Sequence, residues 1–113
     1  MAVQTPVTIT RAGYDVTANA VTADAGGTEK WAGTGQELLA VINGSGGSIT
    51  VTLVGGVGYA VDSQTPTNRT VAVAAGHTAL IGPFPESIYN DSSGNVNISW
   101  SATTSVKLLV FVP

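Results

Sequence analysis

Hydrophobic and polar residues alternate with a period of two along much of the chain. No stretch of ten or more residues shows the periodicity of an amphipathic helix. The alternation is clearest at residues 95–101, where Val96, Ile98 and Trp100 are separated by asparagine and serine. One apolar and one polar face are typical of a half-buried antiparallel strand. The same pattern predicts strands at four further segments: residues 7–10, 14–18, 48–53 and 71–73.

Two segments are apolar on both faces. Leu38 to Ile42 contains only apolar residues, and Val106 to Val112 carries Lys107 as its only charge. A strand with two apolar faces needs a cover on each. One cover is the core of the domain, and the other is a second layer of the same chain or another subunit. Because so short a chain supplies only a thin second layer, we expect at least one of these strands to lie at an interface. A central strand of a sandwich is the alternative.

Glycine, proline and asparagine place the turns. Asn43 to Gly47 predicts a hairpin loop, and Asp91 to Asn95 predicts a turn in which Gly94 can adopt a positive φ. Gly82 to Pro85 ends strand pairing, because proline has no backbone donor. A single helical turn is expected at residues 86–89, a short connection at 75–77, and longer loops at 26–36 and 62–69.

These elements predict an all-β protein. We expect one small β-sandwich or jelly-roll-like barrel of about eight short antiparallel strands. The 113 residues fit a single domain, 1–113, whose residues 1–10 form an N-terminal arm or an edge strand.

Composition narrows the function classes. Charged residues are 10% of the chain, against about 25% in an ordinary soluble domain, and the net charge is −3. A nucleic-acid partner is therefore not expected, because such proteins need a basic surface. A membrane span is not expected either, because the uncharged stretch Leu38 to Val61 is interrupted by six glycines. The first ten residues have neither the basic nor the apolar region of a signal peptide.

Candidate chemistry is sparse. There is no cysteine, and the one histidine, His77, falls in a predicted tight turn. The seven carboxylates are scattered, so most are expected to be solvated and none is paired for hydrolysis. Asn90, Asp91, Asn95 and Asn97 are oxygen-rich, but a capped turn explains them better than a calcium site. We expect no catalysis, no cofactor and no metal, and the residues alone predict a compact, non-enzymatic β module.

The aromatic residues offer the remaining site. Trp100 shares the apolar face of its strand and is expected in the core, and Phe111 lies on the less regular face of the last strand. Trp31, Phe84 and Tyr89 fall in predicted loops. They are expected to serve local packing or an assembly contact. The alternative is a planar row of exposed rings that binds carbohydrate.

The second half of the chain carries a distinctive run of residues. It consists of residues 75–85 (AGHTALIGPFP), the Tyr89-Asn90-Asp91 run and residues 98–101 (ISWS). Two earlier segments fit the same pattern: residues 24–27 (DAGG) and 39–43 (LAVIN). This pattern is similar to that of small tailed-bacteriophage proteins encoded near the major capsid protein, which act as capsid decoration, or cement, proteins.

The resemblance implies a structural protein that binds the exterior of the capsid and stabilises the lattice of the major capsid protein. It further implies a homo-oligomer, with a trimer favoured, made in the host cytoplasm and located in the virion. The short alternating run at the N-terminus adds a separate hypothesis, that Ala2 to Thr10 is an arm that adds an edge strand to a neighbour. The candidate assembly-interface residues are Val3, Pro6, Val7, Trp31, Phe84, Tyr89, Leu109 and Phe111.

Two other functions stay open. One is a different virion structural protein, such as a head fibre or a tail component. The other is a carbohydrate- or protein-binding β-sandwich module.

Overall fold

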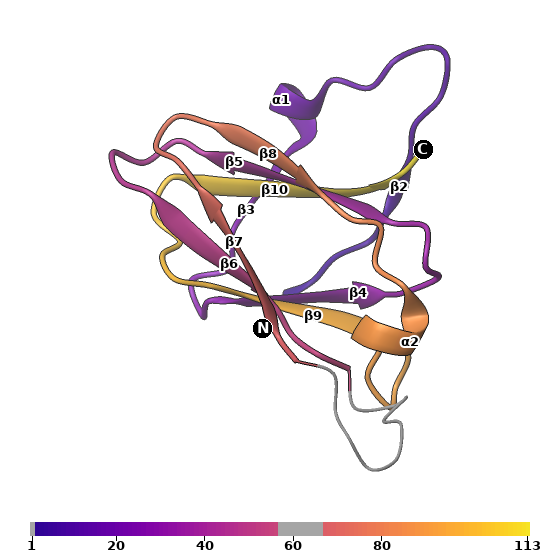
Figure 1. Ribbon diagram of the computed structural model, residues 1–113. Coiled ribbons are helices and arrows are strands. Elements are labelled where there is room, and N and C mark those ends of the chain that lie inside the picture. The colour runs from indigo at the N-terminus through magenta and orange to yellow at the C-terminus, as the bar shows by residue number, and fades with distance from the viewer. Residues whose placement is uncertain (1, 57–66) are drawn as a thin grey trace.

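Two β-sheets packed face to face make up the protein (Figure 1). The computed structural model describes residues 2–56 and 67–113. The first sheet has the strand order β1 (Ala2–Val3), β4 (Thr28–Ala32), β9 (Asn95–Trp100), β6 (Ile49–Leu53) and β7 (Arg69–Val73). The second has the order β2 (Val7–Thr8), β10 (Val106–Val112), β5 (Leu38–Asn43) and β8 (Thr78–Ile81), and β3 (Val21–Thr22) also pairs with β10. Two helical turns, α1 (Val16–Asn19) and α2 (Glu86–Tyr89), complete the described elements.

The core lies between the two sheets and is built from alternate strand residues. On β9 the apolar residues Val96, Ile98 and Trp100 are buried, as the alternation predicts. On the central strands of the second sheet the inward set includes Leu39, Val41, Val106, Leu108 and Val110. The prediction of a small all-β sandwich is confirmed.

The N-terminal segment changes sheets. Its first strand, β1, pairs with β4, and its second, β2, pairs with β10. Both pairings are parallel, so the expectation of antiparallel strands alone is wrong here. Parallel partners cannot be joined by a tight hairpin, but these strands are far apart in sequence, so either direction can form. Strands β1 and β2 are thus edge strands of the chain's own sheets.

The alternation at residues 14–18 does not produce a strand. Residues 16–19 form the helical turn α1, and Asp15 is its N-cap: its carboxylate accepts a hydrogen bond from the backbone N–H of Ala18 at 3.0 Å. A capping acceptor satisfies a donor that a short helix leaves free. In so short a segment this local bond outweighs the period-two pattern.

The loop expected at residues 26–36 contains a strand, β4. Its sequence hides the pattern, because Glu29 occupies an inward position beside Trp31. The second long loop, expected at residues 62–69, lies largely outside the described residues, and β7 begins at Arg69. The helical turn expected at residues 86–89 is confirmed as α2.

Candidate interaction face

The outer face of the second sheet carries the candidate site. Its side chains form cross-strand rows set by the register of β10, β5 and β8. One row contains Leu109, Ala40 and Leu80, and the next contains Lys107, Ile42 and Thr78. This face is therefore largely apolar although it points away from the core, as the two-faced sequences of β5 and β10 predict.

A strap covers part of this outer face; we define it as residues 9–20, between β2 and β3. Both ends of the strap are fixed on β10. The N–H of Ile9 donates to the carbonyl of Val112 at 2.9 Å, and β3, which follows the strap, pairs with β10 through Val21 and Thr22. The strap supplies the thin second layer. Ala40 and Leu109, which are cross-strand neighbours, are 1% and 4% exposed.

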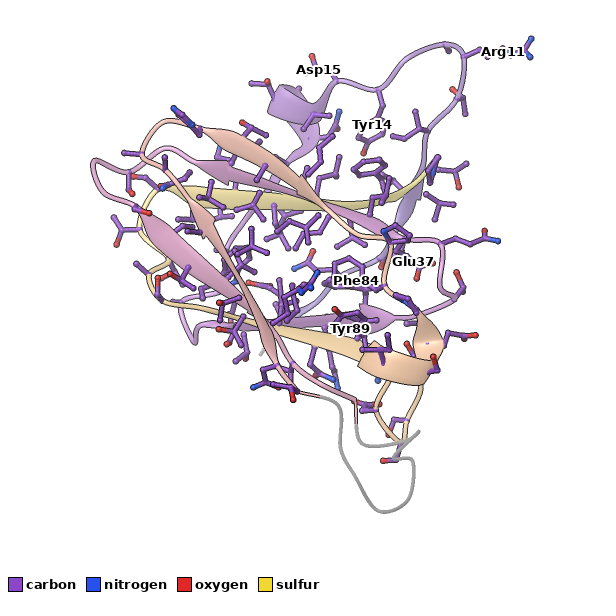
Figure 2. All side chains as sticks on the ribbon, viewed as in Figure 1. Arg11, Tyr14, Asp15, Glu37, Phe84 and Tyr89 are labelled. Atoms are coloured by element: carbon purple, nitrogen blue, oxygen red, sulfur yellow. The ribbon has the colours of Figure 1, made fainter. Side chains whose placement is uncertain are left out.

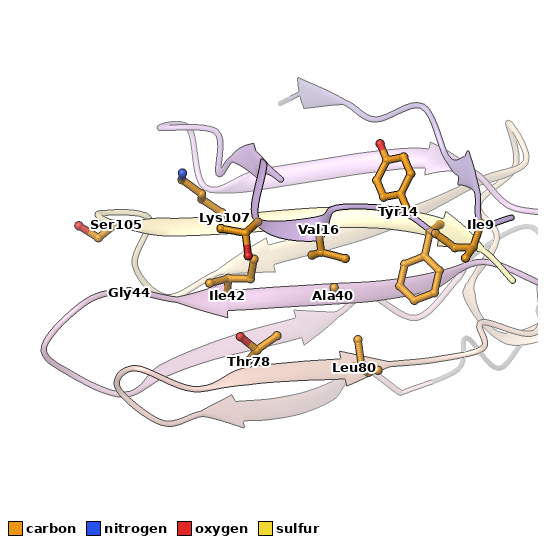
Figure 3. A pocket seen from close by; sticks show the side chains of 12 residues that line it. Ile9, Tyr14, Val16, Ala40, Ile42, Gly44, Thr78, Leu80, Ser105 and Lys107 are labelled. Atoms are coloured by element: carbon orange, nitrogen blue, oxygen red, sulfur yellow. The ribbon is translucent and has the colours of Figure 1, made fainter. Parts of the chain in front are cut away.

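The cover is incomplete and leaves a groove between the strap and β8 (Figure 3). The groove has a volume of about 790 Å³, within the size range of small-molecule ligand pockets. Figure 3 shows Tyr14 and Val16 of the strap above Ala40, with Leu80 on the other side. Leu80 is 70% exposed, so a large apolar side chain on the groove wall faces solvent.

Ser105 and Lys107 lie at one end of the groove (Figure 3). Within residues 2–56 and 67–113 no carboxylate forms an ion pair with Lys107. The rest of the groove is uncharged, and apart from the hydroxyl groups of Tyr14, Thr17 and Thr78 its lining side chains are apolar. The arrangement can therefore bury a partner's apolar side chains with little desolvation of charge.

The predicted aromatic site is not on the surface. Trp31 and Phe84 are 0% and 1% exposed, and their rings meet edge to face with centroids 5.4 Å apart. Phe84 makes a second such contact with the half-buried Tyr89, at 5.5 Å (Figure 2). Trp31 and Phe84 therefore pack in the core, so neither can serve as an interface residue or in a row of exposed sugar-binding rings.

The other predicted interface residues differ in location and exposure. Leu109 is buried beneath the strap, which excludes it from direct contact with a partner. Phe111 lines the groove. Pro6 and Val7 are half-buried along the edge of the second sheet, and Val3 on β1 is 68% exposed. The structure does not gather these residues into one patch.

Several groove residues were not predicted as site residues: Ile9, Tyr14, Val16, Ile42 and Leu80. The two-faced run Leu38 to Ile42 was the signal for Ile42. Nothing local marks Leu80, because its exposure follows from the position of β8 at the edge of the sheet.

Most of the carboxylates were expected to be solvated, but two of them are buried. Glu29 is 0% exposed and accepts hydrogen bonds from Gln4 Nε2 at 2.9 Å, the Asp24 N–H at 2.7 Å and Trp100 Nε1 at 2.8 Å. Glu37 accepts from the N–H of Thr34 at 2.7 Å and from the Thr34 hydroxyl. Neutral donors satisfy both groups, and this arrangement suits a structural role.

The oxygen-rich cluster at residues 90–97 is a capped turn, as expected. Asp91 Oδ1 accepts from the N–H groups of Ser93 and Asn95, at 2.8 and 3.0 Å, and Oδ2 accepts from Asn97 Nδ2 at 2.9 Å. The hydrogen bond from the Asn95 backbone is the main cause that lowers the pKa of Asp91, helped by Asn97, Ser93 and the charge of Lys30. The carboxylate thus holds the turn between α2 and β9.

Comparisons of the chain with protein-family models, with curated proteins and with solved structures give no match. Among the described residues, no helix has the length and apolar character needed to cross a membrane.

Proposed function

We propose that the protein is a structural virion component, a decoration protein that binds the exterior of a tailed-phage capsid and stabilises the lattice of its major capsid protein. It acts as a homo-oligomer, with a trimer favoured, and it carries no catalytic function. The sequence resemblance named above supports the class of partner. The single structural observation in favour is the incompletely covered apolar face of the second sheet.

The proposal rests on the apolar surface that a partner would bury on this face. Burying a leucine side chain is worth about 1.5–3 kcal/mol, and Leu80 is 70% exposed beside an apolar groove. A contact of this size is weak alone, but a protein that binds only the assembled shell stabilises the shell by mass action. Repetition of one contact over a lattice compounds the effect when the bound copies are linked.

The two other functions have less support. A carbohydrate-binding module would need exposed rings, and two of the three candidate aromatics are in the core. A head fibre or tail component would use the same kind of apolar face, but in far fewer copies per particle.

Copy number separates the virion roles. Quantitative mass spectrometry of purified virions should give about one copy per capsid subunit, or a simple fraction of one. A handful of copies per particle would indicate a fibre or tail component, and absence from virions would refute the proposal.

The face itself is tested with purified shells that lack the protein. Leu80→Asp should weaken co-sedimentation with these shells by about tenfold or more, because the variant places a charge in the apolar contact. Ala72→Asp is the matched control, since Ala72 is exposed on β7 of the other sheet. Equal binding by Leu80→Asp and the wild type would show that another surface meets the shell.

A further inference from the structure

Strand β8 is an edge strand with backbone groups free to pair. It is the last strand of the second sheet, and none of the described residues pairs with its free edge, the edge opposite β5. Its sequence, Thr78-Ala79-Leu80-Ile81, contains no charge and no proline. Edge strands usually carry a charged residue or a proline, because these residues block pairing with another chain.

The hydrogen-bond pattern shows which groups are free. The N–H of Asn43 donates to the carbonyl of His77, and the N–H of Gly44 donates to that of Ser105. The odd-numbered residues of β5 therefore form backbone hydrogen bonds with β8, and the even-numbered residues form them with β10. Thr78 and Leu80 are the partners of even residues, so their N–H and C=O groups point away from the sheet.

Both faces of this edge have a pocket. The apolar groove lies on the outer face, with Thr78 and Leu80 on its wall. On the inner face, a cleft of about 240 Å³ lies between β7 and β8 and is lined by Val71, Ile81 and Tyr89. Side chains of an added strand alternate between the two faces of a sheet. Successive residues of such a strand would therefore enter the groove and the cleft in turn.

The cationic side chain of Arg69 lies at one end of the cleft. Arg69 of β7 lines it together with Gly82 and Pro83, beyond the Ile81 end of β8. In the described part of the chain, no carboxylate pairs with Arg69. A carboxylate at the corresponding end of an added strand would complement this charge.

We propose that β8 receives an extended segment of the shell protein as an additional strand. The segment presents apolar side chains alternately to the groove and the cleft, and an acidic residue to Arg69. Main-chain hydrogen bonds to Thr78 and Leu80 give affinity, and the two pockets give specificity. This inference rests on the proposed function, since it names the chemistry of the capsid contact.

A second copy of this chain fits the edge less well. Pairing of Thr78 with Leu80 of the other copy about a two-fold axis would use the same free groups. That arrangement places the Ile81 end of one strand opposite residues 74–77 of the other, and these contain no acidic residue for Arg69.

The test removes one outward N–H and leaves the internal ladder intact. Thr78→Pro lacks the donor on the free side, whereas Thr78→Val, the matched control, keeps it. Thr78→Pro should bind shells that lack the protein about tenfold more weakly than Thr78→Val. Arg69→Glu should also weaken binding, and Arg69→Lys should largely preserve it. Thermal melting of each variant shows whether it is folded.

Amide exchange of wild-type protein gives the second measurement and needs no variant. The amides of Thr78 and Leu80 should exchange fast in the free protein and become protected on shells. Wild-type binding without this protection, or with equal affinities for Thr78→Pro and Thr78→Val, would overturn the strand-addition proposal alone. Failure of the wild type to bind shells would overturn the proposed function together with it. Protection in the free protein, with a dimer in sedimentation, would identify a second copy as the occupant.

Discussion

Glu29 is a buried carboxylate whose three donors come from three different segments of the chain. Gln4 belongs to the N-terminal segment, Asp24 follows β3, and Trp100 ends β9. A carboxylate has only acceptor oxygens, so it can satisfy all three donors at once. One residue thereby joins the N-terminal segment to the core of the first sheet.

Glu29→Gln is expected to destabilise the fold by about 2–3 kcal/mol, because the amide turns one acceptor into a donor that faces another donor. Urea denaturation measures the change in the free energy of unfolding. Glu86→Gln is the control, since Glu86 is exposed on α2 and its change should be within about 0.5 kcal/mol of zero. A small effect at Glu29 would mean that water replaces the lost bonds.

Among the elements, the strap has local hydrogen bonds of its own between its two anchors on β10. Asp15 caps α1, and the N–H of Ala20 donates to the carbonyl of Val16 at 2.8 Å. The strap in turn shields Ala40 and Leu109 from solvent. Its stability therefore controls how much of the apolar face is open.

Loss of the cap should loosen the strap and leave the sandwich folded. Asp15→Ala is expected to cost about 1 kcal/mol locally and to speed amide exchange at Ala18 and Ala20 about fivefold. Asp15→Ser keeps a capping oxygen and should restore protection. Unchanged exchange in Asp15→Ala would show that packing on the sheet holds the strap without its cap.

The sequence pattern predicts some of these elements and fails for others. The strands β6 and β9 follow from the period-two alternation, and β5 and β10 follow from runs that are apolar on both faces. Periodicity fails for β4, where three neutral donors allow the buried Glu29 to occupy a core position. It fails at residues 14–18 because a side-chain cap decides the conformation of a segment one turn long.

The candidate face was predictable only in part. The two-faced run of β5 requires a second cover, but the sequence does not say which segment provides it. The exposure of Leu80 and the free backbone of β8 depend on strand order, which no local pattern encodes. The buried state of Trp31 and Phe84 likewise depends on contacts between elements far apart in the chain.

At the scale of the whole molecule, low charge sets the kind of association available. Only 10% of the residues are charged. Among the described strands of the second sheet Lys107 is the one charged residue, and the strap over their outer face adds Arg11 and Asp15. Attraction between exposed charges weakens as salt shortens the Debye length, whereas apolar burial does not. Binding to shells should therefore depend weakly on ionic strength.

The wild-type dissociation constant for shells that lack the protein should rise no more than about fivefold between about 50 mM and 500 mM sodium chloride, since one exposed ion pair at Arg69 is worth at most about 1 kcal/mol. Arg69→Gln should remove most of that rise. Sodium sulfate should tighten binding, because it strengthens apolar burial. A loss of more than about a hundredfold in the same salt range would instead indicate several ion pairs, and the apolar face would then not be the main contact.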